Sequence, residues 1–174
     1  IKALNLQLDP HFMYNTLNMV SLMAMEKEEY EISDIVVSLS NMMKYLIRND
    51  TPLVPFETDL MYLKSYIKIM TMRFEDAFEV EYDIDESLYP LPVPKFFLQP
   101  LVENAFVHGL DQVRNGGKVR IECKRDGAHA RFVVEDNGRG IDEDQLDRIR
   151  RGEGHVGLMN VNERIKAHFG EPYG

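Results

Sequence analysis

Apolar side chains recur at every third or fourth position over residues 10–27, and this spacing predicts an amphipathic helix. Asp9 and Pro10 are a typical helix start, because aspartate accepts hydrogen bonds from the first free N–H groups and proline fits the first turn. The apolar stripe of this helix consists of Met13, Leu17, Val20 and Ala24.

The same spacing predicts two further helices, over residues 33–48 and 57–74. Ser33 is placed to cap the first of them, and the charged residues 26–29 join it to the preceding helix as an antiparallel hairpin. The expected inner faces carry Ile35, Leu39, Met42, Met43 and Leu46 in helix 33–48, and Leu60, Leu63, Ile67 and Met70 in helix 57–74.

The helical hairpin needs a partner, because two helices alone cannot bury their apolar stripes. We expect it to pair with a second copy of itself, so that the chain forms a homodimer through a four-helix bundle. Packing of the hairpin on the rest of its own chain is the alternative that the pattern leaves open.

Beyond residue 74 the period changes to two, which predicts strands. The expected strands cover residues 78–84, 119–123 and 132–134, with a hairpin turn at Asp126 and Gly127. Helices are expected over residues 100–109, from a cap at Asp142 to residue 151, and over 157–169, where Gly170 ends the last one. Residues 90–94 form a proline-rich connector.

This order of elements predicts an α+β fold with two domains. Residues 1–75 would form the helical domain, and residues 76–174 a sheet covered by helices, an α/β sandwich. All 11 glycines lie from Gly109 onward, so tight turns and any close backbone approach to a ligand belong to the second domain.

The chain of 174 residues has 20 basic and 29 acidic side chains and a net charge of −9. This charge argues against nucleic-acid and anionic-membrane binding, because both need a basic face, but not against a small anion in a local pocket. The single cysteine, Cys123, excludes an intrachain disulfide and fits a reducing compartment. No apolar run approaches the ~18 residues that a membrane span needs.

His11 lies in the first turn of the first predicted helix, where the helix dipole favours the neutral imidazole over the charged one. A neutral imidazole can act as a nucleophile. Asn15 is four residues further and shares its face, so it could hydrogen-bond a group on His11 or orient a water. A histidine that only caps or packs the end of a bundle is the alternative.

Polar side chains interrupt the helix predicted over residues 100–109. Glu103 and Asn104 point to different sides, whereas Asn104 and His108 share a face. An asparagine oxygen that faces a triphosphate suits Mg²⁺, which takes few protein ligands and keeps several waters. A polar face that is merely solvated is the alternative.

Residues 133–141 combine the end of a strand with a glycine-rich turn. Gly138 and Gly140 permit a sharp turn under a flat ring. A buried Asp136 carboxylate would accept a hydrogen bond from an exocyclic amine such as that of adenine. Asp-Asn-Gly is also an ordinary turn sequence.

Residues 152–161 lead from glycines into the start of a helix, where N–H groups and the dipole attract phosphate oxygens. Arg148, Arg150 and Arg151 precede this segment and suit a phosphate-covering lid. A solvated helix face would have the same composition.

Residues 11–18, 98–105, 135–141 and 156–165, in this order, resemble the catalytic core of bacterial sensor histidine kinases of the LytS/YesM type. The resemblance implies a helical dimerisation and phosphoacceptor domain, followed by an ATP-binding sandwich of the gyrase and Hsp90 type. It implies ATP- and Mg²⁺-dependent phosphorylation of His11 and transfer to an aspartate of a response regulator receiver domain. In this family the sandwich continues past Gly174, so we expect marginal packing on one sheet face. The parent would be membrane-anchored, with this part in the cytoplasm.

The resemblance also implies roles for single residues. His11 matches the phosphoacceptor, Asn104 the Mg²⁺ ligand and Asp136 the adenine-binding aspartate. Asn15 matches a residue that positions water for dephosphorylation of the regulator. The two nucleotide loops correspond to Gly138 and Gly140, and to Gly154 and Gly157 with Leu158.

Three positions depart from the patterns of related kinases. Val107 stands where many relatives have a phosphate-contacting lysine, so His108 or a lid arginine such as Arg151 must supply the charge. His155 replaces an expected glycine. Phe12 follows His11 where other classes place an acidic base, which leaves Asp9 or Glu103 as candidate bases.

Two other functions fit parts of this pattern. A non-catalytic dimer module that binds nucleotide and signals by conformation is the main alternative. An ATPase or protein-serine kinase is disfavoured, because Pro100 occupies the place of the catalytic glutamate of those ATPases. In the kinase interpretation, the chain between Phe74 and Phe78 is the expected hinge.

Overall fold

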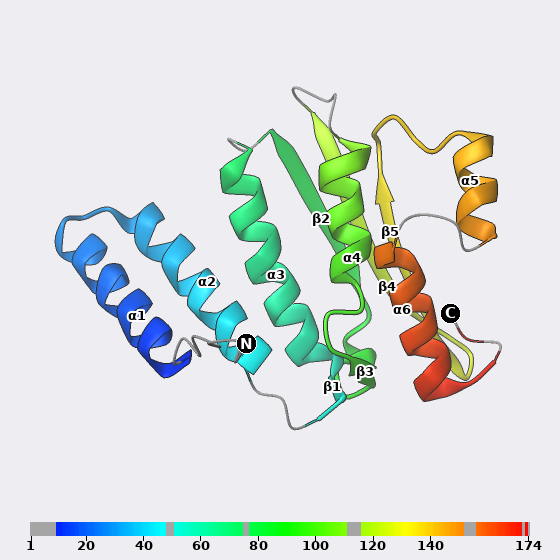
Figure 1. Cartoon of the computed structure of the whole chain (residues 1–174), viewed down its shortest axis with the longest axis horizontal. Coiled ribbons are helices and arrows are strands. Elements are labelled where there is room, and N and C mark those ends of the chain that lie inside the picture. The colour runs from blue at the N-terminus through cyan, green and yellow to red at the C-terminus, as the bar shows by residue number, and fades with distance from the viewer. Residues whose placement is uncertain are drawn as a thin grey trace, which may run out of the picture.

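The computed structural model describes residues 10–47, 51–74, 77–110, 116–151, 156–171 and 173. A helical hairpin lies at one end of the molecule, and a layer of helices on a sheet makes up the rest (Figure 1). The predicted succession of helices and strands is confirmed in its main elements.

The hairpin consists of two antiparallel helices, α1 (Pro10–Glu26) and α2 (Tyr30–Ile47). Glu28 makes the turn between them with a φ of 60°. The prediction that Ser33 caps α2 is wrong, because α2 already begins at Tyr30. Ser33 is instead buried against α1, where its hydroxyl lies 2.8 Å from that of Ser21.

The outward face of α2 is more apolar than expected. Leu39 and Leu46, predicted on the inner face, are 41% and 58% exposed. Ile32 is also exposed, and these three residues follow one another at intervals of seven. The hairpin therefore presents an apolar stripe to the outside of the chain.

Helix α3 (Phe56–Arg73) packs on the sheet. Its buried side chains belong to the same hydrophobic core as Phe78, Val119 and Ile121. The domain boundary near residue 75 stays a prediction, but this packing groups α3 with the sheet, and we propose a boundary between α2 and α3. The core residues of α3 are Phe56, Leu60, Leu63, Ile67 and Met70.

The main sheet has three strands in the order β2-β4-β5. Strand β4 (Gly117–Asp126) runs parallel to β2 (Phe78–Ile84) and antiparallel to β5 (His129–Asp136). Gly127 adopts a φ of 60° in the β4–β5 turn, as the predicted hairpin requires.

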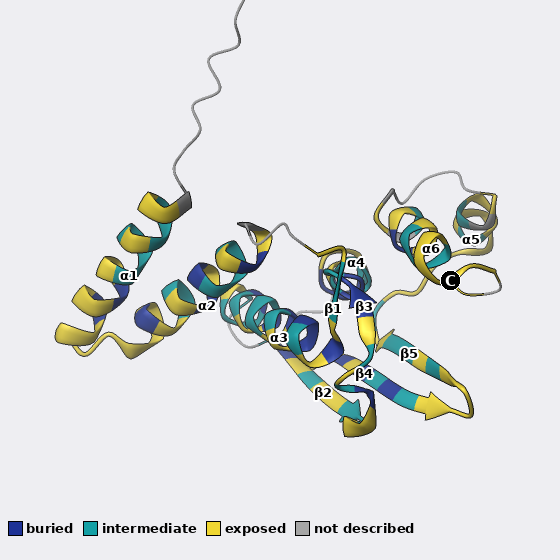
Figure 2. Cartoon of the chain, turned by 90° about the horizontal axis from the view of Figure 1, so that it is seen from below, coloured by how far each residue is buried: buried dark blue, intermediate teal, exposed yellow. Residues whose placement is uncertain are grey.

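Helices cover one face of this sheet, whereas its other face is rich in exposed residues (Figure 2). The exposed face carries ion pairs across the strands: Lys118 with Glu79, and both Arg120 and Lys124 with Asp83. The buried side chains alternate with them, so the period of two in the sequence follows the two faces of the sheet.

The proline-rich connector contains a strand that the sequence analysis did not predict. Strand β3 (Pro92–Pro94) pairs antiparallel with β1 (Leu53–Pro55) in a separate sheet, with Val54 opposite Val93. Prolines are tolerated there because each strand of a two-stranded sheet has an edge that needs no ladder bonds. A short 3₁₀ helix, η1 (Glu86–Leu88), precedes β3.

Three further helices follow β3 along the chain. Helix α4 (Gln99–Asn104) continues into a π turn, η2 (Ala105–Gly109), whereas α5 (Glu143–Arg150) and α6 (Val156–Phe169) follow the sheet. Asp142 caps α5 by accepting a hydrogen bond from Gln145, as predicted. Gly170 follows α6 with a φ of 78°. Within the described ranges, no helix has the length and apolarity to span a membrane.

Candidate functional site

Asn104 is the last residue of α4 and is partly buried. Val102 and Phe106 on either side of it are fully buried and anchor this segment in the core. The π turn then closes with a hydrogen bond of 2.9 Å from the N–H of Leu110 to the carbonyl of Ala105. Such turns occur frequently at functional sites, and this one rotates the residues that follow Asn104.

Gly109, at the end of the π turn, lies directly against the loop after β5. A Cβ carbon on Gly138 would overlap the carbonyl oxygen of Gly109, and one on Gly109 would lie 2.6 Å from Oδ1 of Asp136. The N–H of Arg139 donates to the same carbonyl over 3.1 Å. Gly138 is therefore required by close backbone approach, whereas a side chain at Gly109 would displace the Asp136 carboxylate.

Asp136 ends β5 and is exposed, so the expectation that its carboxylate is buried is wrong for this structure. Its Oδ1 accepts a hydrogen bond of 2.9 Å from the N–H of Gly138. A carboxylate has further acceptor positions, so this bond orients the group and still allows it to accept from a ligand amine.

Asn137 holds this loop on β4. Its Oδ1 accepts from the N–H of Lys118 over 2.7 Å, and its Nδ2 donates to the carbonyl of Gly116 over 3.0 Å. The sequence analysis assigned no role to Asn137 or Gly109. Both residues have a recognisable sequence signal. Asn137 is the middle residue of an Asp-Asn-Gly turn, and Gly109 is the first glycine of the chain.

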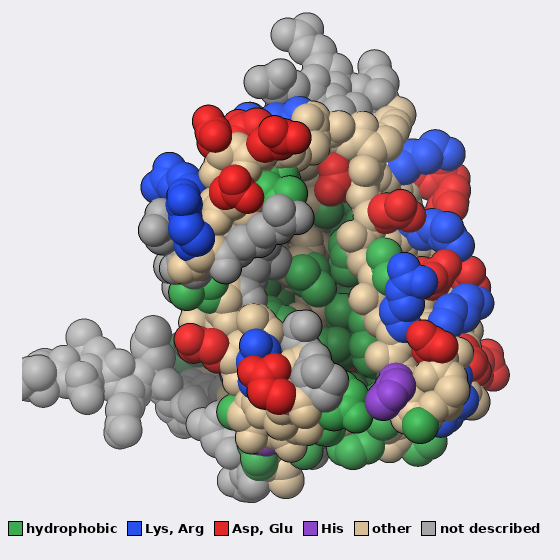
Figure 3. Space-filling model, turned by 90° about the vertical axis from the view of Figure 1, so that its right-hand side faces the viewer, with side chains coloured by type: hydrophobic (Ala, Val, Ile, Leu, Met, Phe, Trp, Pro, Cys, Tyr) green, Lys and Arg blue, Asp and Glu red, His purple; other side chains and the backbone are tan. Residues whose placement is uncertain are grey.

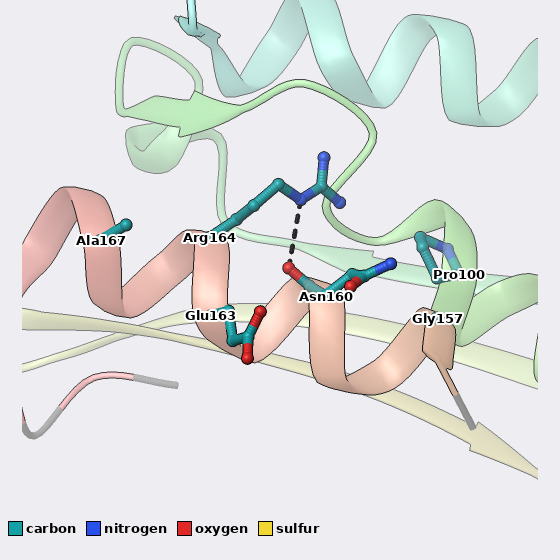
Figure 4. A pocket seen from close by; sticks show the side chains of 6 residues that line it. All are labelled: Pro100, Gly157, Asn160, Glu163, Arg164 and Ala167. Carbon is teal, nitrogen blue, oxygen red and sulfur yellow. Dashed lines mark hydrogen bonds between the residues drawn. The ribbon is translucent and has the colours of Figure 1, made fainter. Parts of the chain in front are cut away.

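Gly157 lies in the first turn of α6 and faces α4, where a Cβ carbon would lie 3.5 Å from Cβ of Pro100. The two helices border an open groove of about 640 Å³ whose lining is shown in Figure 4. Asn160 and Glu163 line it further along α6. The positive end of the α6 dipole is thus next to the segment that carries Asn104.

Several predicted residues lie elsewhere or outside the described residues. Gly140 adopts a φ of 70° in the loop after β5. Glu103, His108 and Arg151 are exposed. Gly154 and His155, like Asp9, lie outside the described residues, as does the side chain of Leu158.

His11 and Asn15 form a pair on the first turns of α1, with Nδ2 of Asn15 3.1 Å from Nδ1 of His11. Both side chains are exposed. The prediction that they share a face is confirmed. Phe12 is 64% exposed beside them, so the residue after His11 presents an apolar ring to the outside.

The structure places Gly157 against Pro100 at the start of α4 and Asp136 against Gly109 at the end of η2, with Asn104 between these two contacts along the chain, but it leaves His11 apart from them. Helix α1 lies at the opposite end of the molecule from β5 and α5 in both Figure 1 and Figure 2. His11 is therefore remote from the predicted nucleotide site of its own chain.

A second hollow, of about 700 Å³, separates α6 from β3 and β5. Its lining is mostly apolar and includes Val93, Phe132, Val161 and Ile165. Figure 3 shows a hollowed face with hydrophobic side chains at its floor and charged ones at its rim.

The donor set suits a metal that is held chiefly by a substrate. No group of three or more His, Cys, Asp or Glu side chains that could hold a metal ion occurs in the described part of the chain. Asn104 offers one amide oxygen at the end of α4. One or two protein oxygens with phosphate oxygens and waters make up the usual surroundings of Mg²⁺.

Comparison with known families divides the chain into two segments. Residues 1–78 match the histidine kinase family, and residues 95–173 match the histidine kinase-, DNA gyrase B-, and HSP90-like ATPase family. The second family is one of ATP-binding domains.

Individual relatives match over nearly the whole chain. It is 35% identical to the sensor histidine kinase YesM of Bacillus subtilis over 100% of its length, and 34% identical to the sensor histidine kinase YpdA of Escherichia coli over 98%. The sensor protein LytS of Bacillus cereus is 31% identical over 98%. The chain spans only 30 to 31% of the length of these relatives.

Proposed function

This chain belongs to the sensor histidine kinases, and we propose that it transfers the γ-phosphoryl group of ATP to His11 and then to an aspartate of a response regulator receiver domain. The observation that carries the proposal is that the α4–η2 segment, which holds Asn104, contacts Gly157 at its start and Asp136 at its end. The exposed His11–Asn15 pair on α1 supplies the acceptor.

The nucleotide would lie between the end of α4, the loop after β5 and the start of α6. Asp136 would accept a hydrogen bond from the adenine amine, and the Gly109–Gly138 contact would hold the loop that carries Asp136 in place. The N–H groups at the start of α6 would face the phosphates. His108 and Arg151 would supply positive charge next to the phosphates. Gly140, and Gly154 with Leu158, would form the two loops that enclose the nucleotide.

Asn104 would hold Mg²⁺ through its amide oxygen, and the ion, when bound, neutralises charge on the phosphates. The protein's main contribution is to position the donor and the acceptor, since phosphoryl transfer needs little covalent help from side chains.

His11 would attack through Nε2, whose lone pair forms the new N–P bond while the bond from the γ-phosphorus to the bridging oxygen breaks. ADP leaves with that electron pair. After a half-turn of the Asn15 amide, its Oδ1 can accept a hydrogen bond from Nδ1–H of His11, which keeps the lone pair on Nε2. The Nδ1 proton then leaves the ring. Glu103 is the candidate base that would take this proton and pass it to solvent. In the second step a receiver carboxylate oxygen displaces the imidazole, and Asn15 would later position the water that hydrolyses the phosphoaspartate.

A second copy of the chain would cover the exposed apolar stripe of α2. Ile32, Leu39 and Leu46 recur every seven residues, which is the spacing of packed helices in bundles. Such a dimer would place His11 of one chain near the nucleotide site of its own or of the other chain after a domain movement. We place this core in the cytoplasm, with the receiver domain.

Incubation of the protein with γ-labelled ATP and Mg²⁺ tests the proposal. We expect acid-labile, base-stable label on the wild type, none on His11→Gln and full label on His168→Gln. The last variant is a matched control, because His168 is exposed on α6 away from α1. Label that survives His11→Gln would overturn the assignment, and tight nucleotide binding without label would favour a non-catalytic module.

A further inference from the structure

Tyr45, in the last turns of α2, is inserted into the α/β part of the molecule. Its side chain is 3% exposed, and its hydroxyl donates a hydrogen bond of 2.7 Å to Oδ1 of Asp59. Asp59 lies in the first turn of α3 and is 2% exposed. A buried carboxylate needs hydrogen-bond donors. Movement of α2 away from α3 would remove the Tyr45 donor from Asp59.

Aromatic rings enclose Tyr45 from two sides. It stacks on Tyr62 of α3 with ring centroids 3.9 Å apart and an angle of 12°, and it meets the edge of Phe96 at 4.7 Å. The ammonium group of Lys95 lies 5.3 Å from the Tyr45 ring centroid. One side chain of the hairpin therefore touches both α3 and the loop between β3 and α4.

The loop contact continues to the helix that borders the nucleotide site. The N–H of Phe96 donates to Oδ1 of Asp59 over 2.6 Å, and Phe96 has a φ of 56°, which is rare for a residue with a side chain. The neighbouring carbonyl, of Lys95, accepts a hydrogen bond of 2.9 Å from Nη1 of Arg164 on α6. Asp59 thus links Tyr45 to the loop between β3 and α4, which Arg164 of α6 also contacts.

The hairpin has another contact with α3 that is far more exposed. Lys68 and Asp34 form an ion pair of 2.6 Å, but both side chains are about half exposed, and such pairs contribute little. Tyr45, by contrast, is buried and makes both a hydrogen bond and ring contacts, so withdrawal of this side chain would weaken the docking of the hairpin.

We propose that Tyr45 is a latch that docks the phosphoacceptor hairpin on the nucleotide-binding domain and holds α1 away from the nucleotide site. The proposal rests on the proposed kinase function. In this arrangement α1 and the site lie at opposite ends of the molecule, so transfer within one chain requires the latch to open. Opening exposes the Tyr45 hydroxyl and the Asp59 carboxylate to water together, so neither polar group is left buried without a partner.

Two variants weaken the latch to different degrees. Tyr45→Phe keeps the ring and removes the hydrogen bond to Asp59, whereas Tyr45→Ala also removes the stacking. Loss of a hydrogen bond to a charged group shifts such an equilibrium by about tenfold or more. We expect faster labelling by γ-labelled ATP in the order wild type, Tyr45→Phe, Tyr45→Ala, with unchanged affinity for ATP. Tyr30→Phe is the matched control, because Tyr30 lies exposed on the same helix.

A distance measurement tests the latch independently of catalysis. Spin labels on Glu26→Cys in α1 and Arg131→Cys in β5 report the separation of the hairpin from the sheet, in dimers that carry one labelled chain. We expect one dominant long distance in the wild type and a second, shorter population in the Tyr45 variants. Distances and labelling rates that are the same in all variants would overturn the latch. Absence of phosphorylation in every protein, with the shorter population still present, would overturn the kinase proposal and retain the docking contact.

Discussion

The carbonyl of Gly109 and the backbone of Gly138 approach so closely that a Cβ carbon on Gly138 would overlap the carbonyl oxygen. This contact joins the end of the π turn to the loop that orients Asp136. It connects two glycines that are far apart in sequence, and Gly138 cannot be exchanged for a larger residue without moving the backbone.

Gly138→Ala should therefore abolish nucleotide binding. The added methyl group displaces the Gly109 segment or the Asp136 loop, and both border the proposed site. A titration with a fluorescent ATP analogue measures the affinity. Gly127→Ala is the control: it introduces strain at a φ of 60°, but nothing lies within 4 Å of its Cβ position, so it should lower stability and leave binding intact. Equal affinities for Gly138→Ala and the wild type would contradict the role of this contact.

Asn15→Ala should slow phosphorylation of His11 by about fivefold, the effect of one lost hydrogen bond. The reason is that His11 loses the partner that orients its ring. The initial rate of labelling at saturating ATP checks this. Thr16→Ala serves as control, because the Thr16 hydroxyl bonds only the backbone of its own helix at Phe12. A slow rate in the control and a normal one in Asn15→Ala would reverse the assignment.

Cys123 should not react with thiol reagents in the folded protein. It is fully buried on β4, and burial raises the pKa of its thiol to about 12, so the reactive thiolate is scarce at neutral pH. Absorbance of a released chromogenic thiol measures the reaction. Glu26→Cys, on the exposed end of α1, should react at once, and unfolding in urea should release Cys123. Fast native reaction of Cys123 would mean that β4 is accessible.

Asp59→Asn should change stability in a pH-dependent way. Burial raises the pKa of the Asp59 carboxyl above its usual 3.8, against the opposing effects of the Tyr45 and Phe96 hydrogen bonds and of Arg164. The folded state then binds more protons than the unfolded state between these two pKa values, so wild-type stability falls as pH rises through that window. Asparagine does not titrate, so we expect the free energy of unfolding of the variant to increase relative to that of the wild type as pH rises. Urea unfolding at several pH values measures this difference.

Asp83→Asn should change stability with the opposite dependence on pH. The hydrogen bond from Lys124, followed by that from Arg120, lowers the pKa of Asp83. Its stabilising contribution is therefore present above pH 3.8, the usual pKa of this group, and is lost as pH falls through the lowered pKa. This variant should therefore be less stable than the wild type only at higher pH. If the difference in unfolding free energy from the wild type changed with pH in the same direction for both variants, the opposite pKa shifts of Asp59 and Asp83 would be contradicted.

Leu46→Glu should convert the proposed dimer into a monomer. Leu46 is 58% exposed in the single chain, so glutamate is tolerated there, but a buried glutamate would oppose pairing with a second copy. Light scattering after size-exclusion chromatography gives the mass. Lys27→Glu, in the exposed turn between α1 and α2, should leave the mass unchanged. A dimeric Leu46→Glu would place the interface elsewhere.

Local sequence patterns predicted most elements, because their causes are local. The alternation over 78–84 matches β2, and Asp142, Gly127 and Gly170 act at the cap, turn and helix end where they were expected. Each of these signals depends on hydrogen bonds or on a φ angle within a few residues of the chain.

The errors arose where distant residues decide the outcome. Ser33 was expected as a cap but is buried, because Ser21 on the neighbouring helix supplies its partner. Pro92–Pro94 forms a strand only because Leu53–Pro55 lies beside it. Leu39 and Leu46 were assigned inward from spacing, which gives the period of a stripe but not the direction that it faces.

The sequence by itself determined which residues we propose for the chemistry: His11 with Asn15 on one helical face, and Asn104, Asp136 and Gly157 in glycine-rich or polar segments. Only the tertiary structure decided that Gly109 touches Asp136 and Gly138, that Gly157 lies against Pro100, and that Tyr45 is inserted beside Asp59. The physical reason is that residue type and local spacing set hydrogen-bonding capacity and backbone freedom. Proximity depends on how α3, α4 and α6 bury their apolar faces on the sheet, and no local pattern specifies this.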